Sequence, residues 1–440
     1  MIKVITYGTY DNLHRGHIRL LERAKALGDY LIVGVTAEDF DKVRGKINVE
    51  QSLVERMDAV RATGLADEII VEEYEGQKID DIRRYGVDIF TVGSDWVGKF
   101  DYLKEYCDVV YLERTEGISS TEIRSKKQSL KIAFIGKGPV VEKYHSESAF
   151  VNGMECVAHL SVDDSKASFE SSYRELLENV DAIFLATHPK DHFQQIQTAL
   201  EKGVHVLCES PLTEKEEDCR LLQSAAKANN LVLMEAIKTA YSTAYNRLLL
   251  LAKSGRIGRI ISVDSVCTGL GRVNSSESTT DDEWQDAMEY WAPTACLPIF
   301  QLLGTVGFSD SYVAYCDKQR GDLSDFVKAN FRYPASVGSF RVGRSVKAEG
   351  ELIVSGTEGY IYVPAPWWKT DYFEIRHEDP SLNKRYFYQL DGEGIRNQLL
   401  TFARTIEKGK SLSGVSPEES LAISRVMEHF KSEEYTVLFS

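Results

Sequence analysis

The sequence has little cysteine, no long apolar run and a shortage of basic residues, and each of these excludes a class of protein. Its 440 residues include 7 cysteines, which are scattered and form no CxxC pair. We therefore expect neither a disulfide framework nor a zinc site, and the predicted compartment is a reducing cytoplasm. No apolar stretch approaches the roughly 20 residues that a membrane-spanning helix needs, and the first residues lack the apolar core of a signal peptide.

The shortage of basic residues bears on the partners of the protein. Lys and Arg number 52 against 67 Asp and Glu, which gives a formal net charge of −15. An acidic surface repels polyanions, so we expect no binding to nucleic acid or to anionic membranes. A phosphorylated ligand must then be held by local donors. Apolar residues make up 43% of the chain, enough to bury several cores.

Strand and helix alternate from the first residues, which predicts an α/β protein. Short apolar strands, beginning with Ile2–Tyr7 and Tyr30–Thr36, are separated by helical patterns, the first of them at His17–Leu27. Such alternation with short connections indicates parallel βαβ units whose ligands bind at the carboxyl ends of the strands.

Two changes in this pattern divide the chain into three predicted domains. A polar stretch at residues 125–130 precedes a fresh strand, Ile132–Ile135, and a new glycine-bearing loop, as at the start of a second domain. After about Ile260, strands follow one another with few helices between them, which predicts a mixed or antiparallel sheet open on one face. The predicted domains are residues 1–127, with a Rossmann-like fold, residues 128–240, with a second Rossmann-like fold, and residues 241–440, an α+β domain with a large, mostly antiparallel sheet.

The first site signal is a pair of histidines three residues apart, directly after the first strand. In the segment YGTYDNLHRGHIRLLERAK, His17 begins the predicted helix, so backbone N–H groups there face an anion bound over the loop. Gly16 lets the main chain approach a phosphate closely. The structural alternative is that His14 and His17 only cap the helix.

The stretch from residue 1 to about 124 resembles the glycerol-3-phosphate cytidylyltransferases of bacterial cell-wall polymer synthesis. The likeness runs through ITYGTYDNLHRGHIRLLERAKALGDYL, VGSDWVGKFDYL and VVYLERTEGISSTEIR, in this order. The resemblance implies that His14 and His17 contact the triphosphate of CTP and stabilise the charge at the α-phosphorus. It also implies that Thr9 and Tyr10 line the nucleotide-phosphate pocket and that Asp11 lies on the substrate or metal side. The residues that match the second signature of the family are Arg114, Gly117, Ile118, Ser119, Ser120 and Thr121.

The implied reaction depends on positioning and charge neutralisation rather than on covalent help. An oxygen of a polyol phosphate attacks the α-phosphorus of CTP in line and expels pyrophosphate. The segment Ser119–Thr121 is expected to begin a short helix whose N–H groups suit the pyrophosphate. Arg114 and Lys46 are expected among the catalytic groups, with His14 and His17. Arg44, where the family usually has lysine, and Lys46 lie after the second strand; they could clamp the other phosphates or be solvated surface charges.

Two further expectations complete this site. Asp95 and Trp96 lie at the carboxyl end of a predicted strand, where recognition of the base or the substrate is expected. A magnesium ion is expected to bridge the CTP phosphates, held mostly by the substrate rather than by the protein.

From about Leu130 onward the chain resembles the glucose–fructose oxidoreductase and inositol dehydrogenase-like family of NAD(P)-dependent enzymes. The likeness is carried by IAFIGKG, DAIFLATHPKDHF, KGVHVLCESPLTEKEEDCRLLQSAA, VLMEAIKTAYSTAYNRL with SGRIGRI, and IVSGTEGYIYVPAPWW. The resemblance implies a bound NAD or NADP. The positions expected to bind this cofactor are Gly136, Gly138, Thr187, His188 and Glu209.

The sequence departs from this family at its functional positions. The fingerprint GxGxxG keeps Gly136 and Gly138, but Val141 takes the third position and Pro139 intrudes. The EKP motif, whose lysine lies near the nicotinamide, has Ser210 in place of that lysine. The family helix that usually carries Asp and His or Tyr has Ala292 and Cys296 at the nearest positions.

A reduced carbonyl needs a proton source, and several residues could replace the missing one. The candidates are Lys238, Tyr241, His188 and His192, although a structural role is the commoner one for each of these residues taken singly. The choice between NAD and NADP stays open. Asp163 and Asp164 follow a predicted strand, and an acid there would favour NAD through the ribose hydroxyls, but the register is uncertain by a residue or two.

The sequence therefore predicts a bifunctional cytoplasmic enzyme, with CTP and a polyol phosphate as substrates. The first domain is expected to make a CDP-polyol, CDP-glycerol first among them, for cell-wall or capsular polymers, and the C-terminal part to reduce the precursor of that polyol phosphate. One alternative is transfer of CMP to another phosphorylated polyol or a phosphonate. Another makes the C-terminal part a non-catalytic dehydrogenase fold for oligomerisation or ligand sensing. A homodimer is expected from the open sheet face and from dimeric relatives of the first domain.

Overall fold

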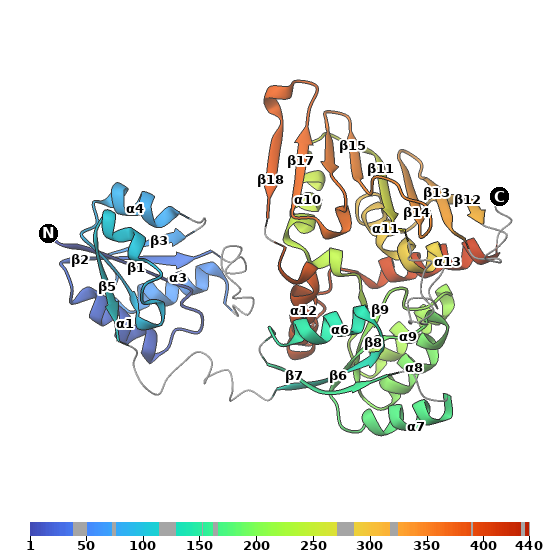
Figure 1. Ribbon diagram of the computed structural model, residues 1–440, viewed down its shortest axis with the longest axis horizontal. Coiled ribbons are helices and arrows are strands. Elements are labelled where there is room, and N and C mark those ends of the chain that lie inside the picture. Colours follow the sequence, from blue (N-terminus) through green and yellow to red (C-terminus); the bar gives the residue numbers. More distant parts are fainter. Residues whose placement is uncertain are drawn as a thin grey trace. The chain divides into compact units, whose positions relative to one another are not determined.

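A computed structural model of the chain forms two compact units, Met1–Ser129 and Leu130–Ser440 (Figure 1). The residues that it describes are 1–37, 51–72, 76–113, 129–151, 153–161, 166–270, 286–316, 324–388, 390–432 and 436–439. The predicted division of the second unit at residue 240 stays a prediction.

The first unit is a five-stranded parallel sheet in the order β3-β2-β1-β4-β5, with helices on both faces. Its elements are β1 (Lys3–Gly8), α1 (Arg15–Lys25), β2 (Tyr30–Thr36), α3 (Leu53–Ala62), β3 (Glu68–Glu72), α4 (Gln77–Tyr85), β4 (Ile89–Gly93), η1 (Ser94–Trp96), η2 (Asp101–Glu105) and β5 (Asp108–Leu112). Alternate strand residues feed two cores: Val4 packs with Leu21 and Val60 from α1 and α3, whereas Ile5 packs with Ile82 from α4.

The second unit begins with another parallel sheet, in the order β10-β9-β8-β6-β7. Its elements are β6 (Leu130–Gly136), α6 (Pro139–Ser148), β7 (Met154–Leu160), α7 (Lys166–Leu176), β8 (Ala182–Ala186), α8 (Pro189–Glu201), β9 (His205–Glu209), α9 (Glu216–Ala228) and β10 (Leu233–Ala236). One face of the sheet packs against α7, α8 and α9 in a single apolar core. On the other face the Tyr144 ring of α6 stacks on Phe184 of β8, with 3.9 Å between ring centroids.

The rest of the second unit is a nine-stranded mixed sheet, in the order β18-β17-β16-β15-β11-β14-β13-β12-β19. The pairings β11–β14 and β12–β19 are parallel and the others are antiparallel. The strands are β11 (Ile260–Thr268), β12 (Ser309–Cys316), β13 (Phe326–Arg332), β14 (Val337–Gly343), β15 (Leu352–Gly356), β16 (Tyr360–Val363), β17 (Tyr372–Arg376), β18 (Lys384–Phe387) and β19 (Thr436–Phe439). The helices and short turns are η3 (Lys238–Tyr241), α10 (Thr243–Lys253), α11 (Ala287–Leu303), η6 (Trp367–Lys369), η7 (Pro380–Leu382), η8 (Asp391–Gly394), α12 (Ile395–Lys408) and α13 (Pro417–Ser432).

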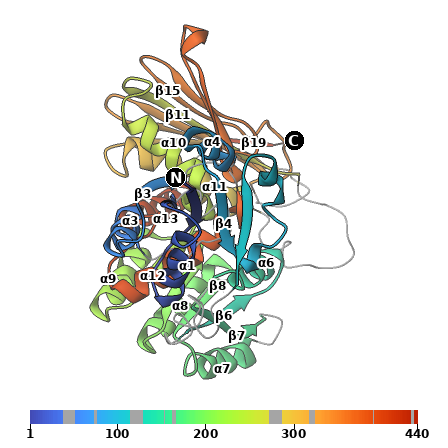
Figure 2. The same ribbon diagram turned by 90° about the vertical axis from the view of Figure 1, so that its left-hand side faces the viewer.

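One face of the mixed sheet is covered by helix α11. Its Ile299 side chain lies so close to β14 that a Cβ at Gly338 would approach it to 2.6 Å. Figure 2 shows the strands of this sheet as an upper layer with α10 and α11 beneath it. Along β13, buried side chains alternate with exposed ones, as expected for a sheet with one covered face.

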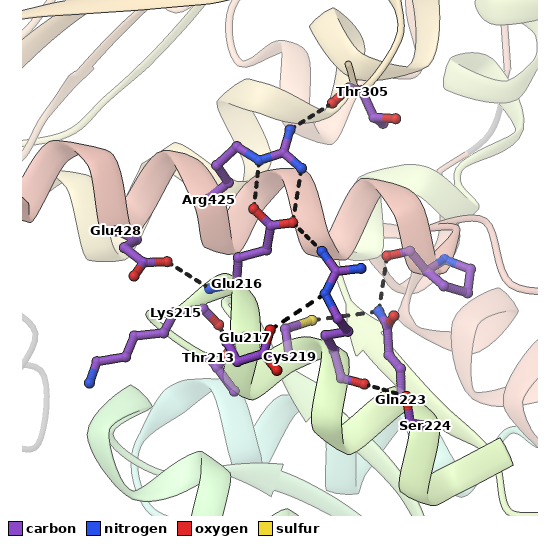
Figure 3. A network of polar contacts seen from close by, with 12 residues as sticks. Thr213, Lys215, Glu216, Glu217, Cys219, Gln223, Ser224, Thr305, Arg425 and Glu428 are labelled. Carbon is purple, nitrogen blue, oxygen red and sulfur yellow. Dashed lines mark hydrogen bonds and ion pairs between the residues drawn. The ribbon is translucent and has the colours of Figure 1, made fainter. Parts of the chain in front are cut away.

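A polar network joins α9 of the parallel sheet to α13 of the C-terminal part (Figure 3). The Arg425 guanidinium donates to both carboxylate oxygens of Glu216, at 2.7 and 3.0 Å, and to the carbonyl oxygen of Thr305 at 3.3 Å. The backbone N–H of Glu216 donates to Glu428, and Arg220 also pairs with Glu216. The two halves of the second unit are thus held by charge-assisted hydrogen bonds as well as by apolar packing.

The predicted fold class is confirmed, but the start of the first helix differs from the prediction. Helix α1 begins at Arg15 and not at His17, because His14 is its N-cap: the Gly16 N–H donates to His14 Nδ1 at 3.0 Å. The predicted short helix at Ser119–Thr121 lies outside the described residues. Within the described part of the chain, no helix is long and apolar enough to cross a membrane.

Candidate active sites of the two units

The first candidate site lies where the strand order of the first sheet reverses. Strands β1 and β4 are neighbours there, and their carboxyl ends lead into the loop before α1 and into η1, respectively. In open parallel sheets this reversal leaves a crevice in which ligands bind. Thr9 to His17 follow β1 and Trp96 follows β4, so these two predicted parts of the site lie at neighbouring strand ends.

The two histidines stack on each other at the N-terminus of α1. Their ring centroids are 3.9 Å apart with an interplanar angle of 18°, and the Tyr10 ring meets His17 edge-on at 5.6 Å. Because His14 Nδ1 accepts the Gly16 N–H, the ring carries its proton on Nε2, which is then the donor. Helix capping and phosphate binding are therefore compatible roles for His14, one on each ring nitrogen.

The loop between β1 and α1 is held from α3 by contacts that the sequence analysis missed. The fully buried Arg56 donates to the carbonyl oxygens of Thr9, at 2.7 Å, and Thr36, at 2.8 Å, which lie at the ends of β1 and β2. Gln51 N–H donates to Asp11 Oδ1 at 3.0 Å. In the sequence, Arg56 is recognisable only as a charged residue within a helical pattern. The sequence does not show which groups its guanidinium contacts.

The loop backbone itself is strained. Tyr10 has φ +52° and Asn12 has φ +48°, the left-handed region that costs a non-glycine residue about 1 kcal/mol. Asn12 N–H donates to Gln51 Oε1 at 2.9 Å, which fixes this conformation. Burial raises the pKa of the Tyr10 hydroxyl, so Tyr10 stays protonated at neutral pH.

A second polar group, also missed from the sequence, is buried in this unit. The Tyr7 hydroxyl donates to Asp81 at 2.8 Å, and Lys78 pairs with Glu72 and lies 4.6 Å from the centroid of the Tyr7 ring.

The predicted recognition residue Trp96 packs on Phe100, with 5.8 Å between ring centroids.

Several predicted residues of the first site lie outside the part of the chain that the structure describes. These are Arg44, Lys46, Arg114, Gly117, Ile118, Ser119, Ser120 and Thr121, together with the side chain of Asp95. Their roles stay predictions. Among the described residues, no group of three or more His, Cys, Asp and Glu residues is arranged to hold a metal ion.

The glycine turn of the second unit has two glycines with positive φ, one at the end of β6 and one at the start of α6. Gly136 has φ +126°, and a Cβ there would lie 2.2 Å from the carbonyl oxygen of Ala186, so only glycine fits. Gly138, with φ +91°, is the N-cap of α6, and Pro139 is the first residue of this helix. Val141 is fully buried, and its Cγ2 would lie 3.1 Å from a Cβ at Gly136. The turn therefore retains a helix N-terminus for a pyrophosphate, with one N–H fewer because of Pro139.

The residues after β8 lie at the neighbouring strand end. His188 is the N-cap of α8, and its Nδ1 accepts the Lys190 N–H at 3.3 Å. His192 is fully buried between the carbonyl oxygens of Pro211, at 2.9 Å, and Thr187, at 3.0 Å. Burial lowers the pKa of His192, and these contacts give it a structural role.

The altered EKP motif has a different charge pattern from the family. Ser210 is buried and its hydroxyl donates to Glu235, which is itself buried. Burial raises the pKa of the neighbouring Glu209 to about 7, against the opposing charge of Lys238. Ala292 and Cys296 are both fully buried in α11. Glu209 can therefore hold a proton near neutral pH. Ser210, Ala292 and Cys296 cannot supply a proton in the way that a lysine or a histidine would.

The two candidate reductase residues have different surroundings. The Lys238 ammonium donates to Glu393 at 2.6 Å; burial lowers the pKa of Lys238, although Glu393 opposes this. The Tyr241 hydroxyl lies 3.0 Å from the hydroxyl of Ser413, and burial raises the pKa of Tyr241 to about 12. Lys238 is thus a charged group close to Glu209, whereas Tyr241 is a buried hydroxyl with a protein partner.

Known proteins match the two units separately. The cytidylyltransferase-like family matches residues 5–126, and the oxidoreductase family with an NAD-binding Rossmann fold matches residues 130–237. A glycerol-3-phosphate cytidylyltransferase of Bacillus spizizenii is 50% identical over 130 residues, which are 30% of this chain and 100% of that protein. The corresponding protein of Bacillus subtilis is 49% identical over 126 residues, 29% of this chain and 97% of that protein.

The second unit has more distant relatives. A trans-1,2-dihydrobenzene-1,2-diol dehydrogenase of Oryctolagus cuniculus is 25% identical over 272 residues, 59% of this chain and 81% of that protein. Among solved structures, a 3-ketoreductase from Actinomadura kijaniata, in complex with TDP-benzene and NADP, superposes with a TM-score of 0.60 at 17% identity. That superposition covers 71% of this chain and 99% of the reductase and shows a shared fold.

Half of the aligned residues are identical over the whole length of a relative, and the histidine pair of the first unit lies at the strand ends where a ligand is expected. The chain therefore belongs to the glycerol-3-phosphate cytidylyltransferase family of nucleotidyltransferases, and residues 130–237 of its second unit match the oxidoreductase family with an NAD-binding Rossmann fold.

Proposed function

We propose that the first unit transfers CMP from CTP to glycerol phosphate, giving CDP-glycerol and pyrophosphate. The observation that carries this is the stacked His14–His17 pair at the N-terminus of α1, at the strand reversal of the sheet. Relatives that match this unit over nearly their full length are glycerol-3-phosphate cytidylyltransferases. Another polyol phosphate, or a phosphonate, is the alternative acceptor.

The proposed mechanism uses hydrogen-bond donors fixed before the substrate binds. A phosphate oxygen of the polyol phosphate forms a bond to the α-phosphorus while the bond to the β-phosphate oxygen breaks, and pyrophosphate leaves with both electrons. His14 donates through Nε2, and His17 supports the developing charge on the phosphoryl oxygens. Arg56 and Gln51 keep the loop in place by engaging Thr9 and Asp11.

Magnesium fits this site as a substrate-held ion. Asp11 lies at the loop, and one of its carboxylate oxygens already accepts the Gln51 N–H. The described residues provide no cage of three or more His, Cys, Asp and Glu residues. We propose that Mg²⁺ is held mostly by the triphosphate and neutralises charge there.

The substrate is tested by incubating the protein with CTP, Mg²⁺ and a panel of polyol phosphates while pyrophosphate release is followed. Glycerol phosphate is expected to give the highest turnover, and ribitol phosphate and a phosphonate serve as comparison acceptors. Turnover that is higher with another acceptor would assign the transferase to that acceptor. No pyrophosphate release with any of them would overturn the proposal.

We propose that the second unit binds a nicotinamide dinucleotide and reduces a keto precursor to the polyol phosphate that the first unit uses. The hydride would come from a reduced nicotinamide held by this unit, and a group of the protein would donate a proton to the oxygen of the carbonyl that is reduced. Glu209, with its raised pKa, and Lys238 are the proposed proton sources. Gly136 and Gly138 would hold the pyrophosphate, with Thr187 and His188 at the neighbouring strand end.

The alternative for the second unit is a dehydrogenase fold that has lost its chemistry and serves oligomerisation or ligand sensing. This alternative is favoured by Ser210, Ala292 and Cys296, which replace the functional residues of the family. Separate titrations of NADH and NADPH, followed by calorimetry, distinguish the two proposals and identify the cofactor. We expect the dinucleotide to bind more weakly than to a domain with an intact GxGxxG fingerprint. If neither NADH nor NADPH binds at millimolar concentration, only the alternative remains.

We further propose that the protein works in the cytoplasm in the synthesis of a cell-wall or capsular polymer. What supports this is the scattered cysteines, which suit a reducing compartment, and the cell-wall role of the family that the first unit resembles. Deletion of the gene should lower the CDP-polyol pool and the polymer made from it.

A further inference from the structure

Three lysines from separate elements of the second unit converge on one carboxylate. Glu393, in η8, pairs with Lys143 of α6 at 2.5 Å, with Lys238 of η3 at 2.6 Å and with Lys369 of η6 at 3.0 Å. Burial alone would raise the pKa of Glu393, but the three lysines lower it to about 2. Glu393 is therefore ionised at neutral pH and is shared by three ammonium groups.

Among the side chains that the structure describes, this cluster has an excess of positive charge. One carboxylate balances one of the three lysines, and like charges held this close repel each other. The neighbouring Glu147 is paired with Arg396 and adds no net charge. Glu209 lies near Lys238, but with a pKa of about 7 it is only partly ionised at neutral pH.

Elsewhere in the same unit a lysine has the opposite balance. Lys431 pairs with two carboxylates, those of Glu214 at 2.6 Å and Glu289 at 2.9 Å. The Glu393 cluster thus has more ammonium groups than carboxylates, whereas the Lys431 cluster has more carboxylates. The chain as a whole is acidic, with a net charge of −15.

The backbone around Glu393 has an unusual conformation that brings it close to the backbone of Lys238. Gly392, Glu393 and Gly394 all have positive φ, of +59°, +53° and +87°. A Cβ at Gly394 would lie 2.4 Å from the carbonyl oxygen of Lys238, so glycine is required there. A non-glycine residue in the left-handed region persists only when its surroundings hold it, and the three lysines do so at Glu393.

Helix α12 begins at this turn. Its N-cap is Gly394, no side chain caps it, and its first turn has no acidic residue. The positive end of the helix dipole is thus added to the lysines. Two independent features, the surplus of ammonium groups and an uncapped N-terminus of a 14-residue helix, therefore favour an anion at the same place.

We propose that Lys143, Lys238 and Lys369, together with the N-terminus of α12, form a binding site for a phosphate group of the ligand of the second unit. Each ammonium group has three donors and uses one on Glu393, so donors remain for phosphate oxygens. In the absence of the ligand, Glu393 offsets part of the repulsion between the lysines and holds all three close to one point.

The inference deepens the function proposed for the second unit, since it assigns that unit a phosphorylated substrate, but phosphate binding does not require that the unit be a reductase. Lys238 belongs to this site, and its charge also acts on Glu209, the other proposed proton source. The phosphate could belong to a monoester such as a keto-polyol phosphate or to the diphosphate of a CDP-linked compound.

The test uses the full-length protein and a readout that is local to this site. Inorganic phosphate is titrated while backbone hydrogen exchange is followed by mass spectrometry in peptides covering residues 390–398. Phosphate should slow exchange in this segment. In Lys369→Gln the phosphate concentration for half-maximal protection should rise about tenfold, because one charge-assisted hydrogen bond is lost.

A matched control is available at Lys202. Lys202 pairs with Glu178 at 3.0 Å and its side chain is 40% exposed, as is that of Lys369, which pairs with Glu393 at the same distance. Lys202→Gln should leave the phosphate titration unchanged. Protection that is absent in the unaltered protein, or that is weakened equally by both substitutions, would overturn the proposal. Thermal unfolding of each variant verifies that it is folded.

Further arms of the same experiment separate the possible ligands and the two proposals. Glycerol phosphate and CDP-glycerol replace inorganic phosphate in turn, and the tighter of the two identifies the monoester or the diphosphate as the source. Phosphate protection without NADH or NADPH binding supports this site and overturns the reductase. Dinucleotide binding without phosphate protection overturns this site and leaves the reductase standing.

Discussion

At the scale of the residue, single side chains combine a structural and a chemical role. His14 caps α1 with one ring nitrogen and thereby leaves its other nitrogen as a donor, so fold and chemistry fix the same tautomer. Glu209 owes its raised pKa to burial at the end of β9. A substitution at such a position changes both properties, and its test must separate them.

Replacing His17 with alanine should abolish most CMP transfer. The ring stacks on His14 at the N-terminus of α1, and loss of one preorganised group at a developing charge typically costs about 10²–10³ in turnover. Pyrophosphate release with CTP and glycerol phosphate measures this. Arg15→Ala, at an exposed position between the two histidines, is the control and should retain activity. A folded His17→Ala protein with most of its turnover would refute the assignment of this site.

Replacing Glu209 with glutamine should change the pH dependence of stability. Its pKa is about 7 in the folded protein against 4.5 for a free carboxyl, so the folded state binds more protons between these values and loses stability as pH rises through this window. The variant should therefore gain on the order of 3 kcal/mol over the parent at pH 8 and differ little at pH 4.

Unfolding by urea at several pH values measures this effect. Glu378→Gln, at an exposed position, is the control and should follow the parent at each pH. A Glu209→Gln protein whose stability runs parallel to that of the parent from pH 4 to pH 8 would contradict the raised pKa.

At the scale of the element, contacts between helices hold the second unit together. Helix α13 reaches α9 through Arg425, which binds both oxygens of Glu216 and the carbonyl oxygen of Thr305. Arg220 binds the same carboxylate from within α9. The two arginines share a partner, but only Arg425 connects separate parts of the fold.

Arg425→Met should destabilise the second unit by about 1–2 kcal/mol, because it removes charge-assisted hydrogen bonds that are partly shielded from water. The Arg425 side chain is 27% exposed, whereas that of Arg220 is 53% exposed. Arg220→Met is therefore the matched control and should cost less than about 0.5 kcal/mol. Chemical unfolding of both variants measures the difference, and equal effects would show that the connection between α9 and α13 carries no extra stability.

At the scale of the whole molecule, two compact units share one chain and each has its own parallel sheet. The mixed sheet of the second unit is covered by α11 on one face, and β13 presents the exposed residues Lys328, Asn330 and Arg332 on the other. A two-fold interface would bring this face of both copies together.

We predict a homodimer at micromolar concentration, which light scattering measures as twice the mass of 49.6 kDa. If the open sheet face is the interface, Asn330→Lys should shift the equilibrium toward the monomer, since a two-fold interface places the added positive charge beside Lys328 and Arg332 of both copies. A monomeric mass for the unaltered protein would contradict the dimer. An unchanged dimer in Asn330→Lys would place the interface elsewhere.

The sequence alone determined the features that depend on local spacing. Strand, glycine turn and helix follow one another with the periods of the two kinds of element, so the two parallel sheets and the mixed sheet were predictable, as was the placement of His14 and His17 at a strand end. The first residue of α1 was not, because a histidine is an unusual N-cap and its hydrogen bond to Gly16 decides where the helix begins.

Tertiary structure decided the contacts between side chains that are distant in the chain. Arg56 reaches Thr9 and Thr36, and Lys143, Lys238 and Lys369 meet at Glu393, although nothing in their local sequence marks them as neighbours. The pKa of Glu209 likewise depends on burial and on Lys238. Hydrophobic periodicity sets which face of an element is buried, whereas the pairing of charges depends on how the elements pack against one another, and that is a property of the fold.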